Sequence, residues 1–173
     1  NSNTIETYFK TSVTTDPGPQ LHEIGGIAGR ILESTATCET IGEIKECSNT
    51  GYLCDVSNRG YLGGIVGELQ EGSIIDCTNA NIVEFAYNAV QNVHIAVGGI
   101  VGNAWGKAKN ITGCTNSGGV IAVTNNAVER GNYIGGIVGW AENESEVSEC
   151  ENTGNVTCNT CADSSKPVAM AGG

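Results

Sequence analysis

The chain has 173 residues, among them 25 glycines and only 3 prolines, and aromatic residues make up 5% of it. Its formal net charge is −11, from 19 acidic and 8 basic residues, which excludes a basic surface for phosphate groups and therefore a nucleic-acid partner. The many glycines indicate tight turns, and no segment keeps the apolar spacing of an amphipathic helix. We expect an all-β chain with no membrane insertion.

One five-residue segment, Gly-Gly-Ile-Ala/Val-Gly, recurs four times. Its copies begin at Gly25, Gly63, Gly98 and Gly135, and a further glycine pair stands at 172–173, so the starts are 38, 35, 37 and 37 residues apart. This period is typical of solenoids and propellers, in which each unit buries its apolar face against its neighbours. We predict a parallel β-solenoid, or β-helix, of about four to five coils with three short strands per coil.

The whole chain is interpreted as one repeat domain, 1–173. Its parts are a partial coil or strand segment at 1–24, repeats at 25–62, 63–97, 98–134 and 135–171, and the start of another repeat at 172–173. Asn1-Ser2-Asn3-Thr4 matches Cys47-Ser48-Asn49-Thr50, so we expect the chain to open in the second half of a coil. That end is predicted to pack against the other end of a neighbouring subunit or of an adjoining part of the same polypeptide. The residues expected at this contact are Ile5, Tyr8, Phe9, Val13, Val168 and Met170.

The strand through each glycine segment is apolar on both faces, which suits a parallel strand covered on both sides. Its isoleucines are predicted to stack in a row, either roofed by a loop or lining a trough between glycines. A bend or a close backbone approach is the more frequent reason for glycine in a strand. The residues of this element are Gly25, Gly26, Ile27, Gly63, Gly64, Ile65, Gly98, Gly99, Ile100, Gly135, Gly136 and Ile137.

A second element, Cys-x-Asn, follows each glycine segment. We predict that its asparagines, Asn49, Asn79, Asn116 and Asn152, stack and hydrogen-bond to one another along the axis. The cysteines in the same register are Cys47, Cys77, Cys114 and Cys150. Parallel stacking would place them about 4.8 Å apart, which permits disulfides, whereas a row of buried free thiols is the alternative.

Four further cysteines lie out of register and are interpreted as disulfide staples near the two ends of the repeat array, namely Cys38, Cys54, Cys158 and Cys161. Such staples indicate an oxidising compartment. Asn-x-Ser/Thr triplets permit N-glycosylation of a secreted protein at Asn110, Asn143 and Asn155.

No nucleophile motif, phosphate loop or zinc motif is present, so we predict neither an enzyme nor a cofactor or metal site. The acidic run Glu142, Glu144, Glu146 and Glu149 is read as a solvated face because it lacks the regular ligand spacing of calcium loops. Six aromatic residues are candidates either for a carbohydrate-stacking platform or for packing, namely Tyr52, Tyr61, Tyr87, Trp105, Tyr133 and Trp140.

The combination of Gly-Gly-Ile-Val-Gly with a following Ile-x-x-Cys-x-Asn-x-Gly resembles the GLUG-type repeats of bacterial and some microbial eukaryotic surface proteins, including the non-catalytic part of the immunoglobulin A metallopeptidases. The resemblance covers roughly Leu21 to Gly173 and implies a β-solenoid on an extracellular protein. Peptidase activity is not implied, because the zinc-binding His-Glu-x-x-His is absent. The high cysteine content departs from the usual bacterial repeats.

From these features we expect a secreted or surface β-solenoid that acts as a structural scaffold and assembles end to end into an extracellular fibre. The alternative is an adhesin or glycan-binding stalk module of a larger surface protein. The expected partners are other copies of the chain, and after them glycans or a host or matrix surface.

Overall fold

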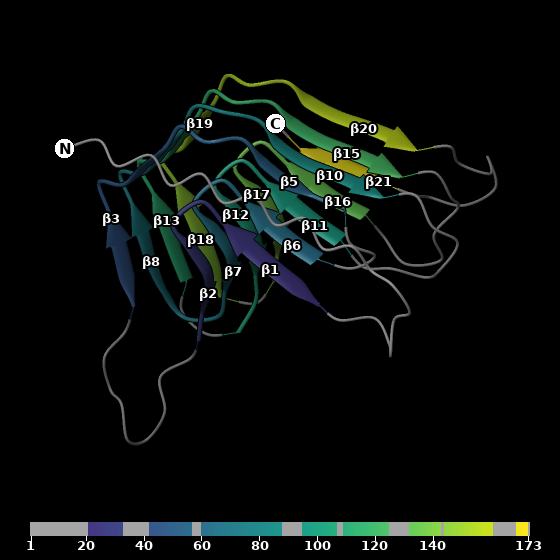
Figure 1. Cartoon of the computed structure of the whole chain (residues 1–173). Coiled ribbons are helices and arrows are strands. Elements are labelled where there is room, and N and C mark those ends of the chain that lie inside the picture. Colours follow the sequence, from purple (N-terminus) through teal and green to yellow (C-terminus); the bar gives the residue numbers. More distant parts are fainter. Residues whose placement is uncertain are drawn as a thin grey trace.

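The computed structural model describes residues 21–32, 42–56, 60–87, 95–106, 109–124, 132–142, 144–160 and 169–172. All regular structure in these residues is β-strand, and the strands form five parallel sheets that wrap around a common axis (Figure 1). Neighbouring strands in each sheet come from successive turns of the chain. The chain is therefore a parallel β-solenoid, as predicted from the sequence.

We number the sheets in the order in which the chain visits them. Sheet 1 contains β1 (His22–Gly25), β6 (Gly60–Gly63), β11 (Ile95–Gly98), β16 (Asn132–Gly135) and β21 (Ala169–Gly172). Sheet 2 contains β2 (Ala28–Ile31), β7 (Val66–Leu69), β12 (Val101–Ala104) and β17 (Val138–Ala141). Sheet 3 contains β3 (Glu43–Lys45), β8 (Gly72–Ile75), β13 (Lys109–Thr112) and β18 (Ser145–Ser148). Sheet 4 contains β4 (Ser48–Asn49), β9 (Thr78–Asn79), β14 (Thr115–Asn116) and β19 (Glu151–Asn152). Sheet 5 contains β5 (Leu53–Asp55), β10 (Val83–Tyr87), β15 (Val120–Thr124) and β20 (Val156–Thr160).

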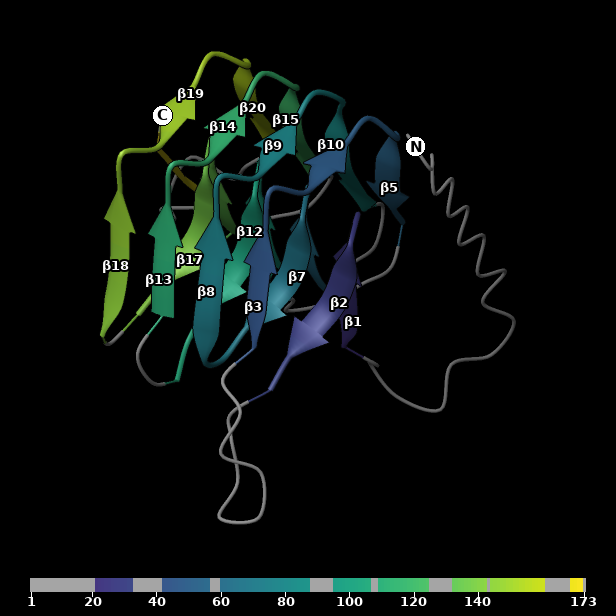
Figure 2. The same cartoon turned by 90° about the vertical axis from the view of Figure 1, so that its left-hand side faces the viewer.

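Each coil passes once through all five sheets, so coil 1 is β1–β5, coil 2 is β6–β10, coil 3 is β11–β15, coil 4 is β16–β20, and β21 begins a fifth. The coils lie side by side along the axis in Figure 2. Gly25, Gly63, Gly98 and Gly135 pair in strict register, so the sequence repeat and the structural repeat coincide.

A coil contains five short strands where the sequence predicted three. The predicted glycine-segment strand is two strands, for example β6 and β7, with Gly64 and Ile65 at a corner between them. The second addition is the two-residue strand that carries each asparagine of sheet 4. The count differs because hydrophobic alternation marks apolar residues but does not mark the points at which the chain changes direction.

The corner explains why the glycine-segment strand is apolar on both faces. Ile65 and Val66 are consecutive, yet both are fully buried and pack in the same cluster with Ile74. An unbroken strand would send them to opposite faces. The isoleucine row therefore lines the solenoid interior, and neither a roofing loop nor an open trough is needed. Glycine in a strand commonly marks a bend, and the structure bends at this point.

The interior is divided into two apolar clusters. One lies between sheets 1 and 5 and has Phe85 as its largest side chain. The other lies between sheets 2 and 3 and includes Ile65, Ile74, Ile100 and Ile111. Sheet 4 and the glycine corner lie between the two clusters, which gives the cross-section the bent outline of Figure 1.

The turn before each cysteine uses a left-handed residue. Glu46, Asp76 and Glu149 have φ angles of 54°, 52° and 54°, and Gly113 has 63° at the equivalent position of coil 3. Side chains other than glycine adopt this region at a cost of about 1–2 kcal/mol. Each turn directs the following cysteine into the interior, so backbone strain is accepted at the same point in three of the four coils.

Candidate functional site

The four asparagines of sheet 4 form a continuous ladder in the solenoid interior. Nδ2 of Asn49 donates to Oδ1 of Asn79, Nδ2 of Asn79 to Oδ1 of Asn116, and Nδ2 of Asn116 to Oδ1 of Asn152, each at 2.8 Å. Each Nδ2 also donates to the carbonyl oxygen two residues later, for example from Asn116 to Gly118 at 2.9 Å. The predicted stacking is confirmed, and every amide faces the same way along the axis.

The second glycine of each segment packs against this ladder across the coil. A Cβ on Gly64 would stand 2.6 Å from Cγ of Asn79 and 2.0 Å from the carbonyl oxygen of Gly99. Neither distance admits a methyl group, so this position takes only glycine. The glycine segment and the asparagine element keep the same period because their residues are in contact.

The in-register cysteines form a parallel row of free thiols. The Cys114 sulfur lies 3.3 Å from the carbonyl oxygen of Thr112 in its own coil and 3.5 Å from that of Ile74 in the preceding one, and Cys77 and Cys150 repeat the pattern. A hydrogen bond with Cys114 lowers the pKa of the Cys77 thiol to about 7, and the same contact, with burial, raises the pKa of Cys114. Of the two alternatives, the structure has the row of free thiols, which are buried at Cys77 and Cys114 and half-buried at Cys47 and Cys150.

Cys54 and Cys158 are also free thiols, which corrects their interpretation as disulfide staples. Cys158 pairs in register with Ala122 and packs against the apolar cluster of sheets 1 and 5, where burial raises its pKa. Cys54 pairs with Glu84 and so lies on the opposite face of sheet 5, three strands away from Cys158. The staples were expected within each end, with Cys38 near Cys54 and Cys161 near Cys158. Cys38 and Cys161 lie outside the described residues.

Outside the interior, the outer faces of sheets 1 and 2 turn toward each other at the glycine corner. We call this region the concave corner and define it by the pairs Glu23 and Arg30, Tyr61 and Glu68, Ala96 and Asn103, and Tyr133 and Trp140, one pair per coil. The backbones approach closely at its apex, since a Cβ on Gly67 would stand 2.5 Å from the amide nitrogen of Ile24. The last glycine of the segment is therefore required by this corner.

A charged cluster occupies the coil 1 side of the concave corner. Arg30 donates from Nε to Oε2 of Glu68 at 2.5 Å and from its terminal nitrogen to Glu23. Trp105 donates from its ring nitrogen to Oε1 of Glu68, so both carboxylate oxygens of this buried residue have a donor. Burial, with the nearby charge of Glu68, raises the pKa of Glu23 above its ordinary value.

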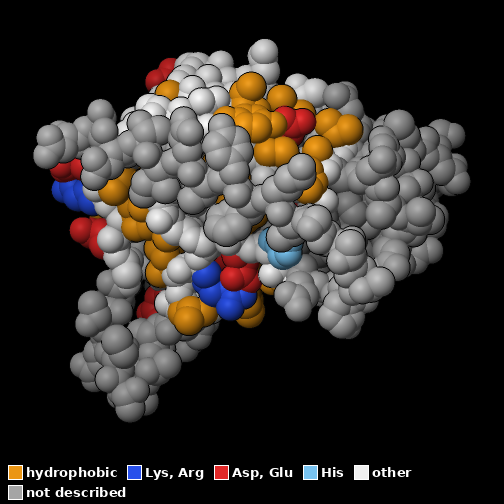
Figure 3. All heavy atoms as spheres, viewed as in Figure 1, with side chains coloured by type: hydrophobic (Ala, Val, Ile, Leu, Met, Phe, Trp, Pro, Cys, Tyr) orange, Lys and Arg blue, Asp and Glu red, His pale blue; other side chains and the backbone are white. Residues whose placement is uncertain are grey.

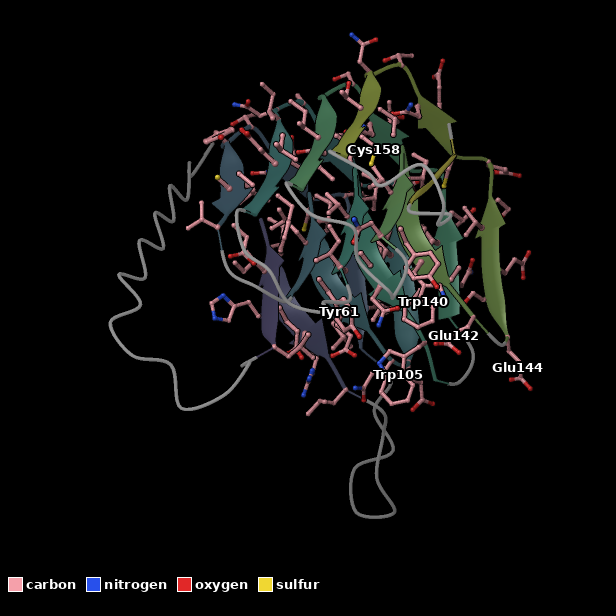
Figure 4. All side chains as sticks on the ribbon, turned by 90° about the vertical axis from the view of Figure 1, so that its right-hand side faces the viewer. Tyr61, Trp105, Trp140, Glu142, Glu144 and Cys158 are labelled. Carbon is pink, nitrogen blue, oxygen red and sulfur yellow. The ribbon has the colours of Figure 1, made fainter. Side chains whose placement is uncertain are left out.

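Aromatic side chains gather on the other side of the corner. The rings of Tyr133 and Trp140 stack with centroids 4.7 Å apart and an interplanar angle of 16°. Figure 4 shows Tyr61, Trp105 and Trp140 on one side of the molecule. Asn103 pairs in register with Trp140 on one side and Glu68 on the other. It is 1% exposed, and its Oδ1 has no hydrogen-bond partner among the residues that the structure describes.

Sequence patterns do not bring these residues together. The aromatic residues are scattered along the chain, and no motif marks Glu23, Arg30, Glu68 or Asn103. The available signal is a constant spacing of seven residues between corner partners, with the glycine pair between them. That spacing indicates a contact only once the chain is known to reverse at those glycines.

The two ends of the described array expose residues that are buried in its middle. Ile27 of coil 1 is 39% exposed and Val147 of coil 4 is 44% exposed, whereas the equivalent residues of coils 2 and 3 are completely buried. Figure 3 looks onto the coil 1 end, where hydrophobic side chains show between polar ones. In the described residues, β2 to β5 at one end and β17 to β20 at the other are the outermost strands of their sheets.

The remaining candidate residues divide by position. Asn155 is exposed in the turn before β20, whereas Asn110 is half-buried within β13 and its Oδ1 is buried. Glu144, Glu146 and Glu149 are exposed, as expected for a solvated face. Candidates outside the described residues are Asn143, Ile5, Tyr8, Phe9, Val13 and Val168, and of Met170 only the backbone is described.

Among the described residues, no group of three or more His, Cys, Asp or Glu side chains is arranged to hold a metal ion. Where the structure describes the chain, it contains no helix that is long and apolar enough to span a membrane.

These features define a parallel β-solenoid whose coils are joined by an internal asparagine ladder facing a glycine corner. Residues 130–157, which include the glycine segment, cysteine and asparagine of coil 4, match the family model of the GLUG motif. Since coils 1 to 3 repeat the same residues in the same register, the solenoid is built from GLUG-type repeats. No curated protein and no solved structure matches the chain.

Proposed function

We propose that this chain is a secreted or surface-exposed structural scaffold whose coils extend by end-to-end stacking into a fibre. The GLUG motif is found in surface and extracellular proteins, which supports this setting. The acidic net charge of −11 favours solubility outside the cell. The role is structural and not catalytic.

The observation that carries the proposal is the exposure of interior residues at the two ends. Ile27 and Val147 belong to rows that are completely buried in the middle coils. Unpaired strand edges beside apolar residues are a template for a further strand. A second copy, or adjoining coils of one polypeptide, would cover both and continue the same sheets.

The asparagine ladder gives this stacking a direction. At the coil 4 end, Nδ2 of Asn152 donates to Gly154 and has no asparagine of a further coil beside it among the described residues. At the coil 1 end, Oδ1 of Asn49 accepts a hydrogen bond from the amide of Gly51, and among the described residues no asparagine of a preceding coil donates to it. A donor end therefore meets an acceptor end, and a contact between unlike ends continues as a filament.

The first experiment compares three single substitutions of apolar residues by aspartate. Val147→Asp and Ile27→Asp each place a charge on one end, whereas Ile82→Asp is the matched control, because Ile82 is 37% exposed but lies in coil 2. Negative-stain microscopy and sedimentation should show filaments for the original chain and for Ile82→Asp. Both end variants should be monomeric and keep the original circular dichroism.

A mixture of the two end variants tests the direction. Each retains one intact end, and those ends are unlike, so the mixture should contain dimers that neither variant forms alone. Dimers of either variant by itself would show that like ends meet. An original chain that stays monomeric at all concentrations, with no neighbouring polypeptide, would overturn the proposal of a self-assembling fibre.

A further inference from the structure

The concave corner contains a buried acceptor that the described protein does not satisfy. Asn103 lies between Glu68 and Trp140 on the outer face of sheet 2, and its Oδ1 is buried without a hydrogen-bond partner in the part of the chain that the structure describes. Buried polar atoms almost always have a partner in protein or water. A hydrogen-bond donor from beyond the described residues is therefore the missing group.

Aromatic residues of the concave corner lie in the coils before and after this acceptor. Trp140, backed by the stacked ring of Tyr133, stands beside Asn103 in coil 4, and Tyr61 lies opposite Glu68 in coil 2. Two coil steps, of about 4.8 Å each, separate Tyr61 from Trp140 along the axis. The corner, in which Tyr61 is 8% exposed and Asn103 1%, thus combines flat apolar rings with a fixed amide, as small-molecule sites commonly do.

The charges of the corner indicate a neutral ligand. Glu68 forms an ion pair with Arg30, so the charge of this carboxylate is already compensated without a cationic ligand. The net charge of −11 opposes an anionic one. What remains is an uncharged molecule that offers hydroxyl donors and an apolar face.

We propose that the concave corner binds a neutral saccharide, which stacks on Trp140 and donates a hydroxyl hydrogen bond to Oδ1 of Asn103. Asn103 is 1% exposed, so a neighbouring side chain must move to admit the ligand. We assign this movement to Trp105, which is 42% exposed and whose indole nitrogen donates to Glu68. This ligand site goes beyond the scaffold role and corresponds to the glycan-binding alternative that the sequence left open.

Tryptophan fluorescence tests the site directly, because the chain contains two tryptophans and both lie at this corner. The probes are tetramers of β-1,4-glucose, α-1,4-glucose, β-1,4-mannose and β-1,4-N-acetylglucosamine, with tetragalacturonate as an anionic comparison. At least one neutral tetramer should shift the emission in a saturable way, and tetragalacturonate should not. The absence of a response to all four neutral tetramers at about 10 mM would overturn the site, since a dissociation constant above that range is no specific site.

Substitutions then separate binding from folding. Asn103→Leu removes the unsatisfied oxygen at similar volume, so the melting temperature should hold or rise while affinity falls at least tenfold. Trp140→Ala should weaken saccharide binding about tenfold, because the stacking surface is lost. Trp105→Phe should strengthen saccharide binding, because the ring at position 105 is then no longer held by a hydrogen bond to Glu68. Tyr52→Ala is the matched control, because Tyr52 is also 42% exposed but lies beside sheet 5.

Unchanged affinity in Asn103→Leu, or an equal loss in Tyr52→Ala, would contradict the assignment. Val147→Asp should bind the saccharide as the original chain does, because that residue lies on an end of the array and not at the corner. The two proposals are therefore tested independently. A chain that forms no filaments can still bind the saccharide, and a chain that binds no saccharide can still form filaments.

Discussion

Gly99 and Asn116 come from opposite walls of coil 3, and Gly99 lies directly against the side chain of Asn116. A Cβ on Gly99 would stand 2.4 Å from Cγ of Asn116 and 2.1 Å from the carbonyl oxygen of Gly136 in the next coil. This contact links the two halves of the repeat motif and separates the two apolar clusters of the interior. The stability of the solenoid therefore depends on close packing between the glycine corner and the asparagine ladder.

We expect Gly99→Ala to abolish folding, because the added methyl group meets backbone that cannot move without separating the coils. Gly119→Ala is the control, since its Cβ would meet Ile82 at 3.7 Å, an ordinary contact. Circular dichroism and thermal melting of the two variants give the comparison. Equal melting temperatures would show that the glycine corner tolerates expansion.

Asn116→Ala should lower the free energy of unfolding by about 3 kcal/mol, because it leaves buried groups of Asn79, Asn152 and Gly118 unpaired. Asn116→Asp should be worse at neutral pH, since a carboxylate cannot donate to Oδ1 of Asn152. Burial disfavours the charged form of a carboxyl group, so this variant should recover stability as the pH falls. Urea unfolding at pH 4.5 and 7.5 measures both effects. If the loss of unfolding free energy in Asn116→Asp were the same at both pH values, the result would contradict the hydrogen-bonded ladder.

Replacing a strained turn residue should stabilise the chain. Glu46 has a φ of 54°, and Gly113 occupies the equivalent position without strain, so Glu46→Gly should raise the free energy of unfolding by about 1 kcal/mol. Glu43→Gly, in the adjacent strand β3, is the control and should be destabilising. A loss of stability in both variants would mean that the left-handed turn carries no strain.

Arg30→Met should destabilise the chain by about 3 kcal/mol, because Glu68 is 2% exposed and would lose one of its two donors. Adding Glu68→Gln removes the buried charge but keeps an acceptor for Trp105. The double variant should therefore recover most of the loss in a denaturant titration. No recovery would show that Arg30 acts through packing of its aliphatic part.

Glu23→Gln should change the pH dependence of stability. Burial raises the pKa of Glu23 in the folded state, so the folded chain binds the proton more tightly than the unfolded chain does. Stability from this group is present below its unfolded pKa of about 4.3 and is lost as the pH rises through the folded value. Between pH 4 and 7 the original chain should thus lose stability relative to Glu23→Gln, and parallel profiles would contradict this.

The sequence was sufficient for the parallel fold and its register, because the glycine segment and the cysteine-asparagine element recur together at one period. It was not sufficient for the corners. Ile65 and Val66 look like opposite faces of a strand until Gly64 is known to turn the chain. The concave corner was not predicted for the same reason, because its partners Tyr133 and Trp140 are in contact only when the chain turns at the glycine pair between them. Disulfide staples were predicted because four cysteines lie out of register, but register does not say which thiols come within bonding distance, and Cys54 and Cys158 are free.

The long circumference of each coil has a mechanical consequence. About 37 residues are needed to advance the solenoid by one strand spacing of about 4.8 Å. A fibre made from such units gains length slowly, but every cross-section contains strands from five sheets, two apolar clusters and an amide in the ladder. Pulling along the axis must break all of these at one level at once. The architecture therefore resists tension but gains little length per residue. These properties suit a short, thick connector more than a long, thin stalk.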